Sequence, residues 1–281
     1  MSAPDFVAIG HVTLDHFGDD VRPGGAALYA AITAHRLGLS AAILTSHGVD
    51  FPLEEVPSQI EVVGLEAPAT TAFEHREVKG GRVLRARGAA RPLTVDDLPA
   101  DWRPAPLVLL APVLQEVDPM LADAFDDAAV GAELQGWLRA TDAQGAISAA
   151  PWVSPEVTLA RLQAVFVSRQ DVQGQESQII EWVQRVPLAV VTAGAGGALL
   201  YVNGDRYEVR PRRTREVDPT GAGDVFAATF IIHYDRHGDA WEAAEAATCA
   251  ASLSVEGEGW STVPDATTLA AALEAYRART R

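Results

Sequence analysis

Short apolar runs alternate with longer alanine-rich segments along this chain. The short runs have almost no polar alternation, which is typical of strands buried on both faces. They cover residues 6–10, 41–45, 106–112, 164–167 and 188–192, with a further strand within 130–139. Helices are predicted over 26–38, 119–129 and 241–255. Because strands and helices alternate, the pattern predicts an α/β protein with a mostly parallel sheet.

Residues 71–78 and 82–87 have a different pattern, in which charged and apolar side chains are mixed. They flank the glycine-containing segment Lys79-Gly80-Gly81. Two such segments around a tight turn predict a β-hairpin that is exposed on one face. In one interpretation these strands cover a binding site; in the other they form a surface hairpin with a solvated arginine face.

The composition fits one large α/β domain or two small ones. The chain has 281 residues, 48% of them hydrophobic, and no repeat or inter-domain linker. Its net charge of −16 argues against nucleic acid or an anionic membrane as a partner. Cys249 is the single cysteine, so no internal disulfide is possible and a reducing, cytoplasmic location is expected. No signal-peptide pattern and no apolar run of about 18 residues is present, so no membrane span is expected.

The most informative stretch is 217–226, where Gly221 and Gly223 flank Ala222 and Asp224 follows. Glycines let the backbone approach a ligand closely and direct consecutive N–H groups toward it. The apolar run that follows predicts a buried helix beginning at or just before Asp224. The positive end of that helix would suit a phosphate. A carboxylate in an anion site is useful if it handles a proton; the alternative is a glycine-rich turn with an acidic first-turn residue.

Two common nucleotide-binding motifs are excluded by single residues. Lys79 is the only lysine, and it fits neither a Walker A loop nor a protein-kinase strand. After the strand at 188–192, a dinucleotide loop would need glycine at Leu199 and a helix, but a strand-like run follows instead. A nucleotide could therefore bind here only without a phosphate-binding lysine.

The string from Asp218 to Phe226, Asp-Pro-Thr-Gly-Ala-Gly-Asp-Val-Phe, closely resembles the signature of the PfkB (ribokinase-like) carbohydrate kinases. The resemblance implies that Asp224 is the catalytic base and that the amides of Gly221, Ala222 and Gly223 form an anion hole. It also implies a ribokinase-like three-layer α/β fold, with a mostly parallel central sheet, helices on both faces and a small β lid. We expect one domain over 1–281, with lid strands within 11–23 and 70–92.

Further positions match the family's substrate site. Asp15 and the pair Gly24-Gly25 resemble its N-terminal signature, in which an early Asp and two glycines bind substrate hydroxyls. The alternative is an ordinary strand–turn–helix. Tyr29 stands where the family commonly has Asn. Glu116 and Arg139 are candidates by position alone, since ligands of open parallel sheets gather at the carboxyl ends of strands; they could equally be surface charges in loops.

The resemblance also assigns the nucleotide site. It implies nucleotide contacts from Thr192, Gly194, Gly197 and Thr220, and a helix packed by the adenine at 241–255. ATP is the implied phosphate donor and a small polyol the implied substrate. A homodimer through the lid is a further expectation.

Metal binding rests on weaker matches. Ser168 and Asp171 occupy the positions of the family's Asn-x-x-Glu, which helps to hold Mg²⁺, and an aspartate still offers oxygen to a hard cation. A monovalent cation is also compatible with the resemblance. His233 and His237 share a helix face, but without a third ligand nearby, solvated or capping histidines are the expected interpretation.

Together these features predict an ATP-dependent phosphotransferase. Asp224 would take the proton of a substrate hydroxyl as that oxygen attacks the γ-phosphate. The substrate would be a sugar, an inositol or a nucleoside. The alternative is a ligand-binding protein that keeps the kinase fold without catalysis.

Overall fold

The computed structural model describes residues 2–78, 81–173 and 176–280. Within these ranges the main sheet has nine strands in the order β15-β14-β13-β12-β9-β8-β1-β4-β5. Neighbours from β13 to β5 are parallel, while β14 and β15 are antiparallel additions at one edge. The strands are β1 (Phe6–Ile9), β4 (Ala41–His47), β5 (Glu61–Glu66), β8 (Leu107–Leu110), β9 (Ala129–Glu133), β12 (Ala164–Ser168), β13 (Leu188–Thr192), β14 (Ala198–Val202) and β15 (Asp205–Val209).

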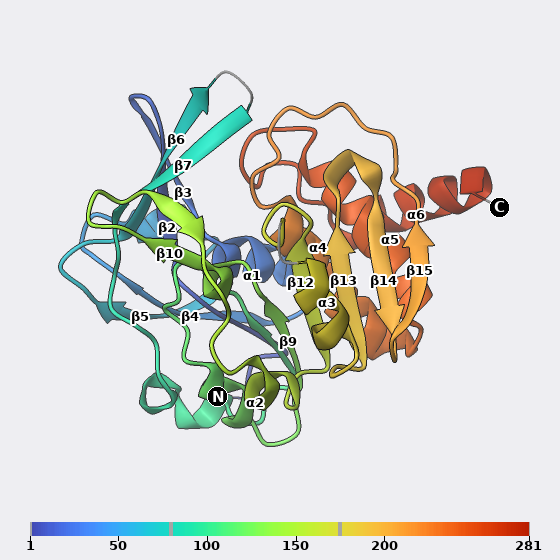
Figure 1. The fold of residues 1–281 in the computed structure, drawn as a ribbon, viewed down its shortest axis with the longest axis horizontal. Coiled ribbons are helices and arrows are strands. Elements are labelled where there is room, and N and C mark those ends of the chain that lie inside the picture. Colours follow the sequence, from blue (N-terminus) through green and yellow to red (C-terminus); the bar gives the residue numbers. More distant parts are fainter. Residues whose placement is uncertain (1, 79–80, 174–175, 281) are drawn as a thin grey trace.

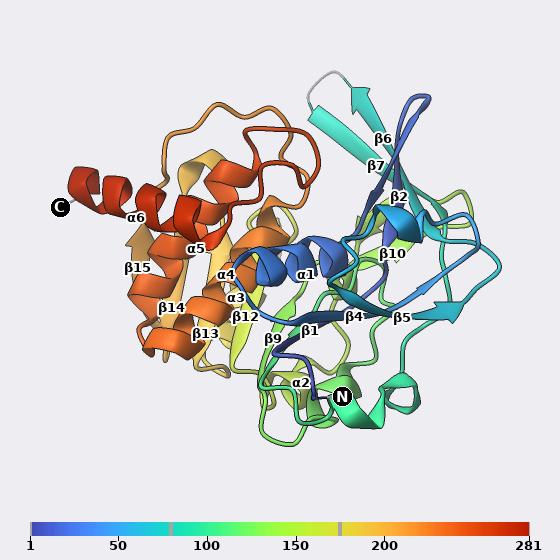
Figure 2. The same cartoon turned by 180° about the vertical axis from the view of Figure 1, so that it is seen from behind.

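Helices cover both faces of the main sheet, as Figures 1 and 2 show from opposite sides. One face packs against α1 (Ala26–Arg36), α4 (Ala222–His237), α5 (Ala240–Ser254) and α6 (Ala266–Thr280). The other face packs against α2 (Pro155–Leu159), α3 (Glu176–Val183) and several turns, and its core contains Trp102, Trp137, Trp152 and Trp182. Because both faces are covered, the central strands are continuously apolar. The predicted three-layer α/β fold is therefore confirmed.

A second sheet stands beyond the carboxyl ends of the parallel strands, at the upper left of Figure 1. Its order is β3-β2-β6-β7, with β2 (Thr13–Phe17), β3 (Asp20–Gly24), β6 (Thr71–Val78) and β7 (Gly81–Gly88). The short hairpin of β10 (Arg139–Thr141) and β11 (Ile147–Ala149) leads to its edge, where the Ala86 N–H donates to Gly145 O at 2.8 Å. The tight turn predicted between β6 and β7 falls on Lys79 and Gly80, outside the described residues.

Helix α4 packs directly against β9 and β12. Gly131 of β9 makes this possible, since a Cβ there would overlap the Ile231 side chain. Phe230 is fully buried and meets the Phe166 ring of β12 edge-on, with 5.4 Å between centroids. These contacts fix the amino end of α4 at the carboxyl ends of β9 and β12.

Some local predictions were wrong or incomplete. The helix predicted over 119–129 is only a 3₁₀ turn, Pro119–Asp123, and Ala129 already belongs to β9. The strand predicted within 130–139 is β9, which is followed by another turn and β10. Strands β5 and β15 and helices α2, α3 and α6 were not predicted. The other 3₁₀ turns are Leu53–Glu55, Val95–Asp97, Ala100–Trp102, Gly136–Leu138 and Gly194–Gly196.

None of the helices in the described ranges is both long and apolar enough to cross a bilayer.

The packing of α4 gives a stability prediction. Phe230→Ala removes a fully buried ring and should lower the free energy of unfolding by about 3–5 kcal/mol. Ile180→Ala, on the exposed side of α3, should change it by less than about 0.5 kcal/mol. Urea unfolding followed by fluorescence measures both. Equal losses in the two variants would contradict the role assigned to the aromatic packing.

Candidate active site

The glycine motif forms the turn into α4. Gly221 has φ +79°, a left-handed conformation that favours glycine, and its carbonyl accepts from the Val225 N–H at 2.9 Å. A Cβ at Gly221 would overlap the ring of Tyr29, which is buried beneath the turn. The N–H groups of a helix's first turn have no partner within the helix. The turn therefore presents backbone donors at the positive end of the helix dipole.

Asp218 holds this turn against the loop that follows α5. Its Oδ1 accepts from the Thr220 N–H at 3.0 Å, and its Oδ2 accepts from the Gly259 N–H at 3.2 Å. The Val217 N–H also donates to Val255 O at 2.7 Å. The backbone of the motif is thus braced from both sides.

Asp224 lies in the first turn of α4 and is flanked by charged groups from several elements. Burial raises its pKa to about 6. A side-chain hydrogen bond from Glu133 and the charge of Arg139 act in the opposite direction, while the charges of Asp15 and Asp171 raise the pKa further. A carboxyl group with this pKa is ionised at neutral pH and can still accept a proton readily.

Glu133, at the carboxyl end of β9, is the neighbour that sequence reasoning missed. Its side chain is buried, and burial together with the Asp224 charge raises its pKa well above the usual range. These two causes favour the neutral form of Glu133, and its side chain shares a hydrogen bond with the Asp224 carboxylate. It could have been found by the positional rule that selected Glu116, since it ends an apolar strand at the carboxyl edge of the sheet.

The predicted substrate residues meet at the base of the second sheet. Asp15 on β2 is buried, and a Cβ at Gly24 would overlap its carboxylate. Gly25 has φ +105° and precedes α1, and a Cβ there would overlap His11 O. The close approach of these backbones explains why both positions are glycine. Asp15 and Asp224 are near enough for their charges to interact.

The predicted nucleotide and metal residues lie at the ends of β12 and β13. Thr192 O accepts from the Arg169 N–H at 2.8 Å, so the two loops are joined. Gly197 has φ +87°, and a Cβ there would overlap Val209 O. Ser168 Oγ donates to Asp171 Oδ2 at 2.5 Å and accepts from the Asp171 N–H at 3.1 Å.

The sequence matches known kinases in two ways. Residues 162–267 match the pfkB family carbohydrate kinases, a segment that contains Asp171, Thr192 and Asp224. A cytidine kinase of Thermococcus kodakarensis is 27% identical over 252 residues, which cover 83% of this chain and 89% of that protein. The match over 162–267 bears out the expected resemblance to the PfkB carbohydrate kinase family.

Solved structures agree with the expected fold. A pyrophosphate-dependent kinase in the ribokinase family, complexed with a pyrophosphate analogue and myo-inositol, has a TM-score of 0.81 at 22% identity, over 95% of this chain and 99% of that chain. Arabidopsis thaliana ribokinase, complexed with ribose and ATP, has a TM-score of 0.74 at 19% identity, over 97% and 99%. The expected ribokinase-like fold and kinase class are both confirmed.

Two candidates chosen by position differ in their surroundings. Arg139 points into the site, with its NH2 atom 3.9 Å from Asp171 Oδ1. Glu116 instead braces a loop, because its carboxylate accepts from three backbone N–H groups: those of His11 at 3.1 Å, Val113 at 2.9 Å and Leu114 at 2.7 Å. With its oxygens engaged in this way, Glu116 is left out of the substrate contacts proposed below.

A divalent cation could be held at this site only if phosphates and waters supplied most of its ligands. Among the described residues, no group of three His, Cys, Asp or Glu side chains is arranged to hold a metal ion. Mg²⁺ in kinases is held mainly by phosphates and waters with one or two carboxylates, so a single carboxylate can suffice as the protein ligand. His233 and His237 stand with ring centroids 5.7 Å apart on the last turns of α4, beyond the apolar stretch that follows Asp224.

The turn into α4 gives a matched pair of variants. Gly221→Ala places a Cβ against Tyr29 in a left-handed conformation, so it should lower the free energy of unfolding by at least about 1 kcal/mol. Gly223→Ala meets open space inside the helix and should be neutral or slightly stabilising. Thermal and urea unfolding measure both. A Gly221→Ala protein as stable as the wild type would show that Tyr29 does not confine this turn.

Proposed function

We propose that this kinase transfers the γ-phosphate of ATP to a hydroxyl group of a small polyhydroxylated molecule, with Asp224 as the general base. The observation that carries the proposal is the placement of a carboxylate with a raised pKa at the amino end of α4. Few other functions need a proton acceptor beside a cluster of backbone donors for an anion. The match to the PfkB family and the cytidine kinase relative support the same chemistry.

In the proposed reaction, Asp224 accepts the proton of the substrate hydroxyl as its oxygen attacks the γ-phosphorus. The bond from that phosphorus to the β–γ bridging oxygen breaks, and ADP leaves with the electron pair. The amides of Gly221, Ala222 and Gly223 stabilise the charge on the transferring group. These donors need little reorganisation at this moment, because Asp218 and Tyr29 already hold the turn in place, although the Ala222 N–H must leave Pro219 O, to which it donates at 3.3 Å.

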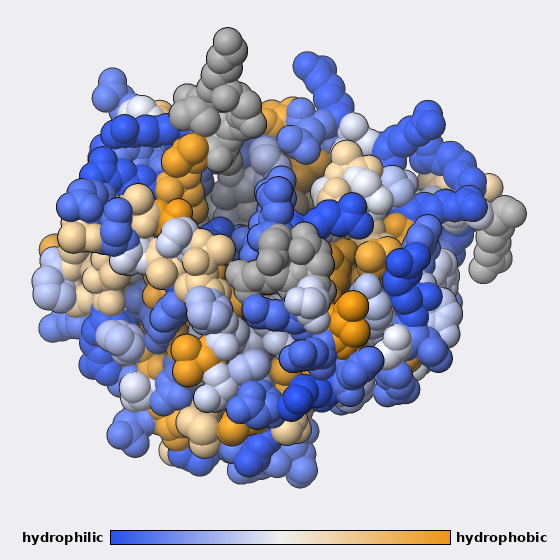
Figure 3. All heavy atoms as spheres, viewed as in Figure 1, coloured by the Kyte–Doolittle hydropathy of each residue, from blue (hydrophilic) through white to orange (hydrophobic). Residues whose placement is uncertain are grey.

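The substrate is a sugar, an inositol or a nucleoside, held by Asp15, Gly24, Gly25 and Arg139. An aspartate accepts two hydroxyl hydrogen bonds, each strengthened by its charge. The carboxylates of Asp15, Asp171 and Asp224 make the proposed substrate site acidic, which favours a neutral substrate over an anionic one. In the space-filling view, the upper part of the molecule is hollowed, with hydrophilic residues along the right of the hollow and hydrophobic ones along its left (Figure 3).

The donor side is assigned to Thr192, Gly194, Gly197 and Thr220. Thr220 supports this, because its buried Oγ1 has no hydrogen-bond partner in the described part of the chain and lies beside the anion-binding turn. Asp171, supported by Ser168, would hold Mg²⁺. When bound, the ion neutralises the charge of the donor phosphates. The second sheet is the proposed lid of a single domain, and a homodimer would use this lid.

Replacing the base should separate binding from chemistry. Asp224→Asn should lower kcat by roughly 10²–10⁴, the usual contribution of a general base, with substrate binding within a few-fold of wild type. Asp235→Asn, on the exposed far end of the same helix, should change neither. Steady-state kinetics and calorimetric titration test both. Near-normal turnover by Asp224→Asn would remove Asp224 from this role.

The assignment of Asp171 as a Mg²⁺ ligand can be tested by measuring how much Mg²⁺ the reaction needs. Asp171→Ala should raise the Mg²⁺ concentration that gives the half-maximal rate, because one carboxylate ligand is lost. The measurement is a Mg²⁺ titration of the rate at saturating ATP and substrate. An unchanged midpoint would show that the ion is held without Asp171.

A further inference from the structure

The two faces of the second sheet have different chemistry. Side chains alternate between faces along a strand, so Asp15 and Phe17 of β2 lie on the opposite face from His16. Strand β6 runs parallel to β2 with Asp15 opposite Phe73, so Phe73 and His75 share the face of Asp15. This inner face is the one that carries the proposed substrate carboxylate.

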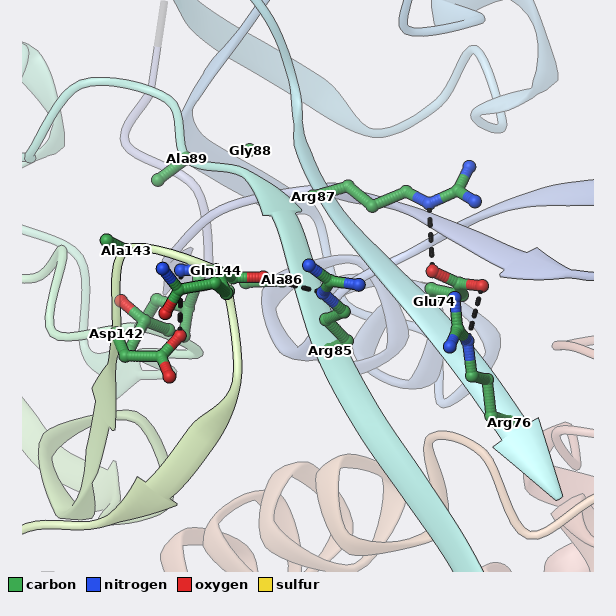
Figure 4. A pocket seen from close by; sticks show the side chains of 13 residues that line it. Glu74, Arg76, Arg85, Ala86, Arg87, Gly88, Ala89, Asp142, Ala143 and Gln144 are labelled. Atoms are coloured by element: carbon green, nitrogen blue, oxygen red, sulfur yellow. Dashed lines mark hydrogen bonds and ion pairs between the residues drawn. The ribbon is translucent and has the colours of Figure 1, made fainter. Parts of the chain in front are cut away.

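The outer face carries arginines that are already paired. A cavity of about 540 Å³ lies there, lined by residues that include Glu74, Arg76, Arg85 and Arg87 (Figure 4). The Glu74 carboxylate accepts hydrogen bonds from Arg76 Nε at 2.7 Å and from Arg87 Nε at 3.3 Å. Arg85 Nε donates to Gln144 O at 2.6 Å. Because each of these three guanidinium groups has a partner within the chain, none of them needs an anionic ligand in the cavity.

His75 on the inner face is in the opposite situation. Its Nε2 lies 3.2 Å from Asp15 Oδ1, and the two side chains are only 11% and 8% exposed. Yet within the described residues neither ring nitrogen has a partner in hydrogen-bonding geometry. Buried polar groups are normally hydrogen-bonded, so a ligand held by Asp15 is the natural source of the missing partner.

The orientation of the imidazole is fixed by the sheet itself. The His75 ring stacks on Phe17, with 4.5 Å between centroids and 7° between the planes. The Arg22 guanidinium of β3 lies over the same Phe17 ring at 5.1 Å, and it approaches from the neighbouring strand on the other side of β2. Arg22 NH1 also lies 3.8 Å from Asp218 Oδ2. The contacts through His75, Phe17 and Arg22 therefore connect the Asp15 carboxylate with the anion-binding turn.

We propose that His75 is a substrate-specificity residue of this kinase, reading a second hydroxyl group next to the one that Asp15 holds. The proposal rests on the proposed function. A neutral imidazole offers one N–H donor and one acceptor, and Asp15 beside it offers acceptors only. Together they match a neutral vicinal diol, in which one hydroxyl donates to Asp15 and its neighbour pairs with His75. A site built in this way rejects analogues that lack the hydroxyl, because the buried group is then left unpaired.

The test uses three variants of the full chain. His75→Phe keeps the stack on Phe17 but removes both nitrogens, while His75→Gln places an amide nitrogen near the position of Nε2. His16→Phe is the matched control, a histidine of the neighbouring strand on the opposite face. Each protein is assayed for phosphorylation, and for binding by calorimetry, with cytidine, ribose and myo-inositol and with single-deoxy analogues of each.

For the best substrate, His75→Phe should raise KM by at least about tenfold and change kcat by less than about threefold. His75→Gln should recover most of the loss, and His16→Phe should match the wild type. One deoxy analogue should bind the wild type and His75→Phe equally, which identifies the hydroxyl that His75 reads. That equality separates recognition from a general disturbance of the fold.

Two results would overturn the role of His75: an unchanged KM in His75→Phe, or a loss of the same size for the parent and every deoxy analogue. Failure of the proposed function looks different. A folded wild-type protein that neither binds nor phosphorylates any compound of the panel contradicts the polyol kinase assignment, and with it this proposal.

Discussion

The partial burial of one carboxylate, Asp224, at the amino end of α4 is the constraint on which the rest of the site depends. In water a carboxylate would be a weak base, but burial raises its pKa to about 6. The hydrogen bond with Glu133 lowers the pKa of Asp224 and so stabilises its charged form, while burial raises the pKa of Glu133 and favours its neutral form. Desolvation thus raises the pKa of Asp224 and makes it a stronger base, and the hydrogen bond with Glu133 limits the size of this rise.

The fold maintains this arrangement through close packing beneath the helix. Gly131 lets α4 approach β9, where Glu133 ends the strand, and Phe230 fixes the helix against β12. At the turn itself, Gly221 has no room for a side chain because Tyr29 fills the space below it. The Tyr29 ring therefore supports the anion-binding turn from below.

The sequence predicted the elements whose signal is local. Continuous apolar runs located β1, β4, β8, β12 and β13, and the glycine motif located the start of α4 within two residues. The sequence was a poor guide where tertiary contacts decide. Residues 119–129 contain helix-forming alanines, yet only Pro119–Asp123 forms a 3₁₀ turn, although Ala124 and Phe125 beyond it also pack into the core.

Two residues central to the site proposals escaped sequence reasoning for the same reason. Glu133 and His75 have no motif around them, and each becomes noteworthy only through a neighbour distant in sequence, Asp224 or Asp15. Glu116 is the opposite case. Its position at a strand end suggested a ligand contact, but its carboxylate accepts hydrogen bonds from backbone amides of a loop instead.

The pH dependence of kcat/KM tests the central claim most directly. With a base of pKa about 6, log kcat/KM should be level above that pH and fall with unit slope below it as Asp224 becomes protonated. Glu133→Leu keeps the site dry but removes the donor, so the break should move to higher pH, whereas Glu133→Gln, which retains a donor, should leave it near 6. A wild-type profile without a break around pH 6, or an identical profile for Glu133→Leu, would contradict the account.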